Sequence, residues 1–195
     1  MKELTGDPFY SLLKSEFPDL RLDYVLLSLE SDQYRGIESH KEAVIMFMDI
    51  KDKRNRERAR LTFPDMEFTD GCFPDLRCNE EQMCATPIAS SDFFRMENLE
   101  LEPDLEDEPG FVFGVCPKHR SYWQAFYDEP YFTFGAEEYE KLNGCLFGHD
   151  LDIYSWNDDF SNYFDTGKKW WGTGLWTIYD KEKERMVIIG ASLSD

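Results

Sequence analysis

Two apolar segments near the C-terminus, Gly172 to Tyr179 and Arg185 to Leu193, constrain the fold more than any other feature of this sequence. Five charged residues, Asp180 to Glu184, separate the two segments. Apolar runs of this length, rich in β-branched and aromatic residues and joined by a short polar connection, are typical of a β-hairpin. The pattern therefore predicts a hairpin over about residues 172–193.

Both faces of this hairpin would be apolar. Side chains alternate along a strand, so Trp176 and Ile178 would point to one side. Leu175 and Tyr179 would point to the other side. We therefore expect the hairpin to lie in the middle of a sheet or to be covered on both sides. This predicts an α+β fold, with a mostly antiparallel sheet and a few peripheral helices.

Two segments carry signals for helices. Asp7 can cap a helix that begins at Pro8, because proline is tolerated in the first helical turn. That helix should end near Phe17, since the next residue is also a proline. Ala136 to Asn143 predicts a second helix, with Gly144 at its C-terminal cap.

Two short apolar runs fit either a helix or a strand, because periodicity does not settle runs of this length. Leu22 to Leu29 stays open between the two. The β-branched residues in Ala43 to Ile50 favour a buried strand, followed by a hairpin across the basic segment Lys51 to Arg60. One long helix from His40 to Leu61 is the alternative. We expect the basic segment to pair with the protein's own carboxylates rather than with phosphate.

A chain of 195 residues fits one domain, and we expect residues 1–195 to form a single unit. Residues 64–110 hold five prolines and should be irregular, so any weak subdivision would fall there. Within them, Glu97 to Glu108 carries seven carboxylates and no cation, which predicts a solvated loop. Strands are expected at Phe111 to Val115 and around Leu151 to Tyr154.

The charge of the chain restricts its partners. Forty Asp and Glu residues oppose 21 Lys and Arg, which gives a net charge of −19. A field of this sign repels nucleic acids and anionic membranes and attracts basic proteins. The first residues contain no signal segment, and the longest apolar run has six residues, too few to span a membrane. We therefore expect a cytoplasmic protein that binds neither nucleic acid nor membrane.

Cysteine and histidine residues offer a candidate zinc site that we do not expect to be used. Cys72, Cys78 and Cys84 are separated by five residues each, whereas structural zinc sites usually place two to four residues between neighbouring ligands. Cys116 and His119 have suitable spacing but form a single pair. We expect the cysteines to be reduced and the protein to hold no metal and no cofactor.

A second candidate site is acidic. His149, Asp150, Asp152, Asp158 and Asp159 lie within eleven residues, and the surrounding sequence has no Lys or Arg. In an extended strand Asp150 and Asp152 would share one face. Neighbouring carboxylates can hold Ca²⁺ or Mg²⁺, but the ligand register and the central glycine of an EF-hand loop are missing. A solvated strand face is the simplest interpretation.

Aromatic residues follow the acidic ones directly. Phe160, Tyr163 and Phe164 precede the pair Trp170 and Trp171, with two lysines just before the pair. Trp and Tyr favour the hot spots of protein interfaces because they bury a large area at low entropic cost, and they also fill protein cores. Carboxylates beside exposed aromatic rings would form a face suited to a basic protein.

The common catalytic and nucleotide-binding signatures are missing from this sequence. We therefore predict a non-enzymatic acidic protein that binds a basic protein partner, as an inhibitor or immunity-type protein would. The predicted face is the segment from His149 to Trp171, with Trp170, Trp171 and the five acidic-site residues as its contacts. The alternative is a carboxylate- or metal-dependent enzyme with its site at His149 to Asp159.

Overall fold

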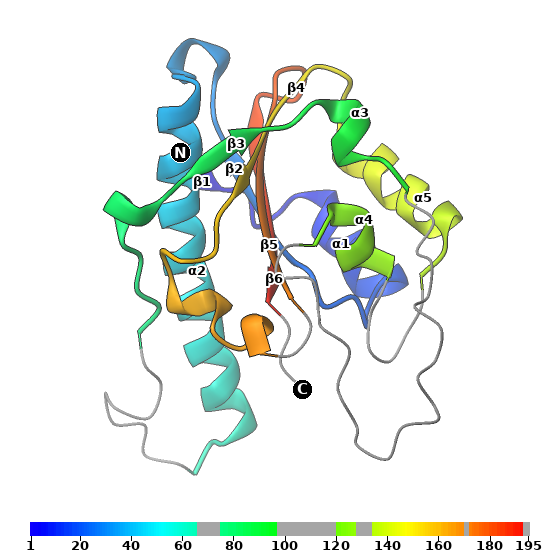
Figure 1. Cartoon of the computed structure of the whole chain (residues 1–195). Coiled ribbons are helices and arrows are strands. Elements are labelled where there is room, and N and C mark those ends of the chain that lie inside the picture. The colour runs from blue at the N-terminus through cyan, green and yellow to red at the C-terminus, as the bar shows by residue number, and fades with distance from the viewer. Residues whose placement is uncertain (66–74, 97–119, 128–133, 170–171, 193–195) are drawn as a thin grey trace, which may run out of the picture.

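The predicted hairpin lies at the centre of an antiparallel sheet (Figure 1). The computed structural model describes residues 1–65, 75–96, 120–127, 134–169 and 172–192. Within these ranges six strands form one sheet in the order β1-β2-β6-β5-β4-β3. The strands are β1 (Lys2–Glu3), β2 (Asp23–Ser28), β3 (Ala85–Pro87), β4 (Leu151–Trp156), β5 (Thr173–Asp180) and β6 (Arg185–Ser192).

Strands β5 and β6 are covered on both faces, as their sequences predict. Every residue of β5 is buried. Trp176 and Ile178 pack into the core on one side of the sheet. Leu175 and Tyr179 pack into a second core on the other side. The position of the hairpin in the middle of the sheet is therefore confirmed, and each of its faces belongs to a separate apolar layer.

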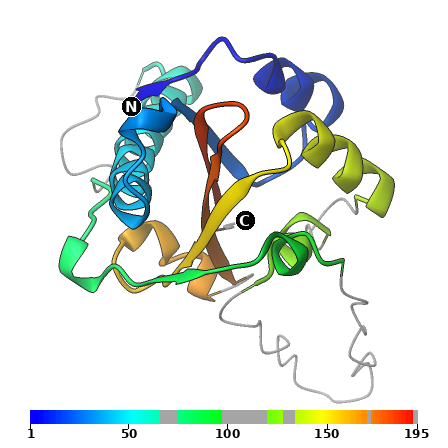
Figure 2. The same ribbon diagram turned by 90° about the horizontal axis from the view of Figure 1, so that it is seen from above.

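One face of the sheet packs against a long helix, α2 (Ile37–Thr62), which Figure 2 shows end-on beside the central strands. The preferred prediction of a strand at Ala43 to Ile50 and a hairpin after it is wrong, and the alternative of one helix is correct. The reason is periodicity, because the buried residues follow the spacing of one helical face. These residues are His40, Ala43, Val44, Phe47 and Met48. The undecided run Leu22 to Leu29 contains strand β2.

The opposite face carries four helices among the described residues: α1 (Pro8–Glu16), α3 (Ser90–Phe93), α4 (Tyr122–Tyr127) and α5 (Ala136–Leu146). Aromatic side chains of these helices pack around the Trp176 indole. Its ring centre lies 6.3 Å from that of Phe93 and 5.8 Å from that of Tyr122. Helices on both faces of an antiparallel sheet confirm the α+β class.

The ends of the predicted helices are partly confirmed. Asp7 caps α1 by accepting a hydrogen bond from the Phe9 amide at 2.9 Å, and the helix ends at Glu16 with Phe17 as its C-terminal cap, near the predicted end. Helix α5 runs past Gly144, so the predicted glycine cap is wrong. The reason is packing, because the fully buried Leu146 extends the helix into the core.

The basic segment forms the second half of α2, which extends beyond the sheet in Figure 1. Several of its cations pair with carboxylates of this chain, as predicted. Lys51 Nζ lies 2.5 Å from Asp23 Oδ1, and the Arg54 guanidinium pairs with Glu3. The segment therefore helps to hold the edge strand β1 and its neighbour β2 against the helix.

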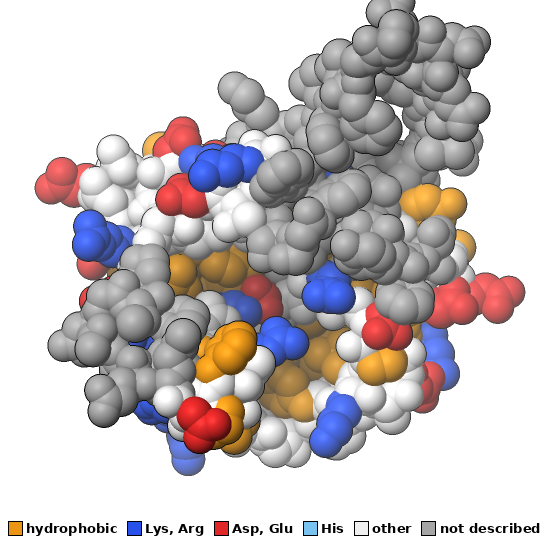
Figure 3. Space-filling view, turned by 90° about the horizontal axis from the view of Figure 1, so that it is seen from below, with side chains coloured by type: hydrophobic (Ala, Val, Ile, Leu, Met, Phe, Trp, Pro, Cys, Tyr) orange, Lys and Arg blue, Asp and Glu red, His pale blue; other side chains and the backbone are white. Residues whose placement is uncertain are grey.

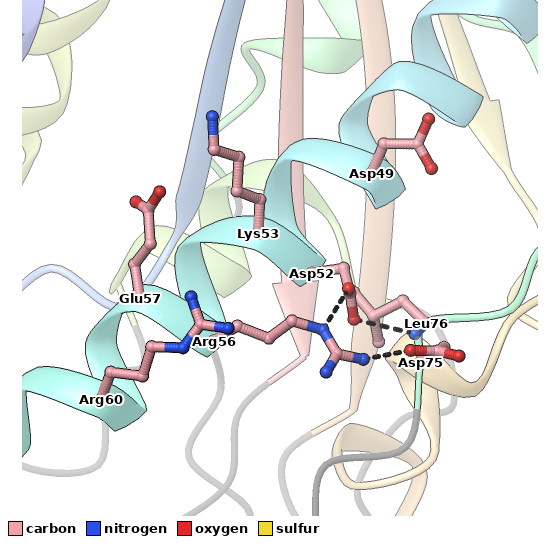
Figure 4. A pocket seen from close by; sticks show the side chains of 8 residues that line it. All are labelled: Asp49, Asp52, Lys53, Arg56, Glu57, Arg60, Asp75 and Leu76. Carbon is pink, nitrogen blue, oxygen red and sulfur yellow. Dashed lines mark hydrogen bonds and ion pairs between the residues drawn. The ribbon is translucent and has the colours of Figure 1, made fainter. Parts of the chain in front are cut away.

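A shallow pocket of about 440 Å³ lies beside this half of α2 (Figure 4). Figure 4 shows Arg56 bridging Asp52 and Asp75, with Arg56 Nε 2.7 Å from Asp52 Oδ2. The charged lining residues are the carboxylates Asp49, Asp52, Glu57 and Asp75 and the cations Lys53, Arg56 and Arg60. The four carboxylates outnumber the three cations here, which does not suit a phosphate group.

Two predicted segments, the strand at Phe111 to Val115 and the acidic loop at Glu97 to Glu108, lie outside the described residues. Among the helices that the structure does describe, none combines the length and the apolar character needed to cross a membrane.

Gly174 leaves the space that the Trp176 indole occupies, since an added Cβ would lie 2.2 Å from Trp176 Cη2. We expect Gly174→Ala to destabilise the fold by about 1–3 kcal/mol because the ring must move. Gly144→Ala is the matched control, because no atom lies within 4 Å of its added Cβ. Inside α5 this change should stabilise by roughly 0.5–1 kcal/mol. Denaturant unfolding of both variants measures the difference, and equal midpoints would contradict it.

Candidate functional site

Strand β4 separates the predicted acidic residues into two groups. His149, Asp150 and Asp152 lie at its beginning, and Asp158 and Asp159 follow its end. The strand has six residues, and at about 3.3 Å per residue it puts roughly 20 Å between the groups. At this separation the two groups do not share one metal ion or one reacting group.

The second group shares one lysine within the molecule. Asp158 is buried and accepts a hydrogen bond from Thr173 Oγ1 at 2.7 Å. Lys168 Nζ lies 3.7 Å from Asp158 Oδ1 and 3.0 Å from Asp159 Oδ1. These contacts fix the connection between β4 and β5, and they leave Asp159 as the exposed carboxylate of the pair.

Asp152 is the surface end of a chain of hydrogen bonds that runs into the core. Tyr34 donates its hydroxyl proton to Asp152 Oδ2, and Tyr34 Oη lies 3.0 Å from His40 Nε2. His40 Nδ1 lies 2.7 Å from Thr177 Oγ1. Thr177 Oγ1 also accepts a hydrogen bond from Trp156 Nε1 at 2.8 Å. The Asp152 side chain is 33% exposed, whereas that of His40 is fully buried.

Local sequence explains how these groups meet. Gly36 has a φ of +59°, in the left-handed region that favours glycine, and lets the chain turn from Tyr34 into α2. Helix α2 then begins at Ile37, so His40 falls in its first turn and faces the sheet. The Tyr34 ring stacks on Tyr179 of β5, with ring centres 4.0 Å apart. The stacking holds the Tyr34 hydroxyl between helix and sheet.

Burial changes the proton affinity of both inner groups. It lowers the pKa of His40 to about 4, although Asp152 and the Thr177 backbone act in the opposite direction. Burial also raises the pKa of Tyr34, and the hydrogen bond to Asp152 raises it further. At neutral pH His40 is therefore neutral and Tyr34 keeps its proton. Ionisable groups with large shifts and a defined charged partner are enriched at functional sites.

The lowered pKa of His40 predicts a loss of stability in acid. An unfolded chain would bind the proton near the ordinary value of 6.5, whereas the folded chain resists it until about pH 4. The stability is therefore fully present above pH 6.5 and falls as the pH decreases toward 4, by about 2–3 kcal/mol in total. Denaturant unfolding at pH 7 and pH 4.5 measures it. His40→Gln, which does not titrate, should lose less stability, and equal losses would contradict the prediction.

Three segments with further carboxylates meet at this end of the sheet, whose ribbon Figure 2 shows from above. They are the short helix η1 (Ser31–Gln33), the start of β4 and the β5–β6 turn. The Ser31 amide donates to Glu184 Oε1 at 3.2 Å, so the first and last of these segments touch. We define the acidic end as Asp32, Asp150, Asp152, Glu182 and Glu184.

The nearby cations are already engaged. Lys181 Nζ pairs with Asp150 at 2.6 Å, and Lys183 Nζ donates to the Cys145 carbonyl at 3.0 Å. Half-buried Tyr154 lies close enough to Asp152 for that charge to raise its pKa, in addition to burial. The acidic end therefore combines an excess of carboxylates with the tyrosine rings that flank Asp152.

The opposite end of the molecule has a different character (Figure 3). Lys and Arg side chains lie there beside hydrophobic ones, together with Asp and Glu, on the part of this face that the structure describes. Both signs of charge therefore occur together on the described part of this face.

Some candidate residues are not placed. Cys72, Cys116, His119, Trp170 and Trp171 lie outside the described residues. In the described part of the chain, no three His, Cys, Asp or Glu side chains lie where they could hold a metal ion together.

Sequence reasoning missed Tyr34, His40 and Thr177. Nothing beside His40 in the sequence marks it, and only the helical spacing it shares with Ala43 and Phe47 would have placed it against the sheet. Comparisons of the chain with protein-family models, curated proteins and solved structures found no match.

Proposed function

We propose that this chain is a non-enzymatic binding protein whose acidic end engages a basic protein partner, in the manner of an inhibitor or immunity-type protein. The anchor is Asp152, with the rings of Tyr34 and Tyr154 beside it. The proposal keeps the partner class expected from the sequence. It limits the face to the residues at the start of β4 and adds those that the fold brings to them.

One observation carries the proposal. Asp152 Oδ2 is held by the Tyr34 hydroxyl, while in the described part of the chain Asp152 Oδ1 accepts no hydrogen bond. A fixed carboxylate with one open oxygen can accept from the guanidinium of an arginine or the ammonium of a lysine. Because Tyr34 is itself held by His40 and Tyr179, little side-chain freedom is lost on binding, which favours affinity.

The surrounding charge supports the same partner class. Asp32, Glu182 and Glu184 are exposed and add to the negative field around Asp152. Such a field speeds the encounter with a positive protein and slows the approach of nucleic acid or an anionic membrane. We place this activity in the cytoplasm, where the reduced cysteines expected from the sequence would persist.

The geometry favours binding over the carboxylate- or metal-dependent enzyme. That alternative needs the carboxylates between His149 and Asp159 to act together, and β4 keeps them apart. Asp158 and Asp159 are in addition paired with Lys168. The tyrosines beside Asp152 provide contact area for a partner, a role that Tyr often has at interfaces.

Capture from an extract of the native host tests the proposal. Immobilised wild type, Asp152→Asn and Asp159→Asn would be compared at low and at high salt. The last two variants change the net charge equally, and both replaced carboxylates are at the surface. We expect basic proteins on the wild type and on Asp159→Asn, released by salt, and fewer on Asp152→Asn. Equal retention on all three surfaces would rule out the acidic end as the binding face.

A further inference from the structure

We propose that His40 is a positioning residue for the binding site: in its neutral form, with the proton on Nε2, it fixes Tyr34 and through Tyr34 the Asp152 carboxylate. The inference rests on the proposed function, because it assigns a role in partner binding to a residue that no partner can touch. His40 is fully buried, whereas Asp152 is at the surface.

The groups at the two ends of this series of hydrogen bonds, Asp152 and Trp156, determine the direction of each bond between them. Asp152 as a carboxylate only accepts, so the single Tyr34 proton goes to it. Tyr34 Oη must then accept from His40 Nε2, which therefore carries the ring proton. Nδ1 of the neutral ring has no proton and accepts the hydroxyl proton of Thr177. Trp156 Nε1 only donates, and it completes the chain at Thr177 Oγ1.

Each group has a partner in this arrangement, and the opposite tautomer would break it. A proton on Nδ1 instead of Nε2 would leave Tyr34 Oη without its donor, since the bare Nε2 would face an oxygen whose single proton already goes to Asp152. It would also take from the Thr177 hydroxyl proton the acceptor that Nδ1 provides. The neutral Nε2–H form is therefore the one that holds Tyr34 in place. This tautomer affects the surface through Tyr34, which has a single hydroxyl proton. With His40 Nε2 as the donor to Tyr34 Oη, that proton goes to the Asp152 carboxylate.

Burial keeps the ring neutral, and of the groups that face it the Asp152 carboxylate acts in the opposite direction. From β4 it faces Asp152, with Oδ2 4.0 Å from Nε2, and Tyr154, with ring centres 4.6 Å apart. From β5 it faces Thr177, and from the segment before α2 it faces Tyr34. Among these described neighbours Asp152 is the charged group. The Tyr34 hydroxyl lies between its carboxylate and the His40 ring.

These hydrogen bonds also contribute to stability, because removing one member leaves a buried polar group without its partner. The alternative to a positioning role is that His40 merely fills the space between α2 and the sheet. The two roles separate when stability and binding are measured on the same variants.

Long-range ¹H–¹⁵N NMR of the wild-type protein gives the first test, because it distinguishes the two tautomers. We expect the Nε2–H form of His40 from pH 7 down to pH 5.5, and a slowly exchanging Tyr34 hydroxyl proton. The Nδ1–H form, or an imidazolium at pH 5.5, would overturn the inference without affecting the proposed function.

Binding of a fluorescein-labelled peptide of alternating Arg and Gly gives the second test. We expect His40→Leu and Tyr34→Phe to fold cooperatively, with midpoints lowered because a buried hydrogen-bonding group loses its partner. We expect both to bind the peptide about tenfold more weakly, as with other supporting residues of preformed sites. His40→Gln can still donate to Tyr34, and we expect it to retain most of the affinity.

The controls keep the two proposals apart. If Asp152→Asn weakens binding but His40→Leu and Tyr34→Phe do not, the inference fails and the proposed function stands. If wild type, Asp152→Asn and Asp159→Asn bind the peptide equally, the proposed function itself fails. If His40→Leu and His40→Gln weaken binding equally, the hydrogen bond to Tyr34 is not what positions the site.

Discussion

Truncating Trp176 to alanine is expected to destabilise the protein by about 3–5 kcal/mol, and Ile188→Ala by about 2–5 kcal/mol. Both side chains are buried at the middle of the central strands, at 2% and 0% exposure. They also point to opposite faces of the sheet, Trp176 toward the four-helix side and Ile188 toward α2. Each substitution therefore tests one of the two apolar layers.

Denaturant unfolding of the two variants measures these losses. Leu61→Ala is the matched control, because this apolar side chain near the end of α2 is 84% exposed and should change the stability by less than about 0.5 kcal/mol. Unchanged midpoints for Trp176→Ala and Ile188→Ala would show that the β5–β6 hairpin is peripheral and that the layered core is wrong.

The parts of the fold that the sequence predicts are those encoded by local signals. The β5–β6 hairpin has apolar strands and a charged turn within about 20 residues, and α1 has an aspartate cap followed by a proline. The sequence favours a strand over helix α2 because the apolar run is short and its continuation from Lys51 to Arg60 is polar except for Ala59. The spacing of the buried residues around Val44 and Phe47 is that of one helical face and predicts the helix.

The candidate site was less predictable because its parts come from distant segments. Asp152 was identified from its acidic surroundings, but Tyr34 is 118 residues away in the chain, and His40 and Thr177 are 137 residues apart. These contacts exist only after α2 has packed on β5, and no local pattern encodes that event. Asp158 illustrates the opposite case, in which neighbours in the sequence have different environments. It adjoins exposed Asp159 but is buried against Thr173.

Replacing Asp152 by asparagine is expected to weaken the binding of a captured basic partner by about 2–5 kcal/mol, on the order of 30-fold to several thousand-fold. The loss arises because a cation of the partner would be buried without its counter-charge. Asparagine still offers an oxygen to the Tyr34 hydroxyl, so the chain of hydrogen bonds to His40 should survive. Unfolding midpoints equal to the wild type would verify that folding is intact.

The dissociation constants of Asp152→Asn and Asp159→Asn for the same captured partner, measured by calorimetry at about 0.15 M salt, test the central claim most directly. The two variants have the same net charge, so a general electrostatic effect weakens both equally. If the acidic end is the binding face, Asp152→Asn weakens binding at least about 30-fold and Asp159→Asn less than about threefold. Equal dissociation constants for the two variants would contradict the assignment of Asp152 as the anchor.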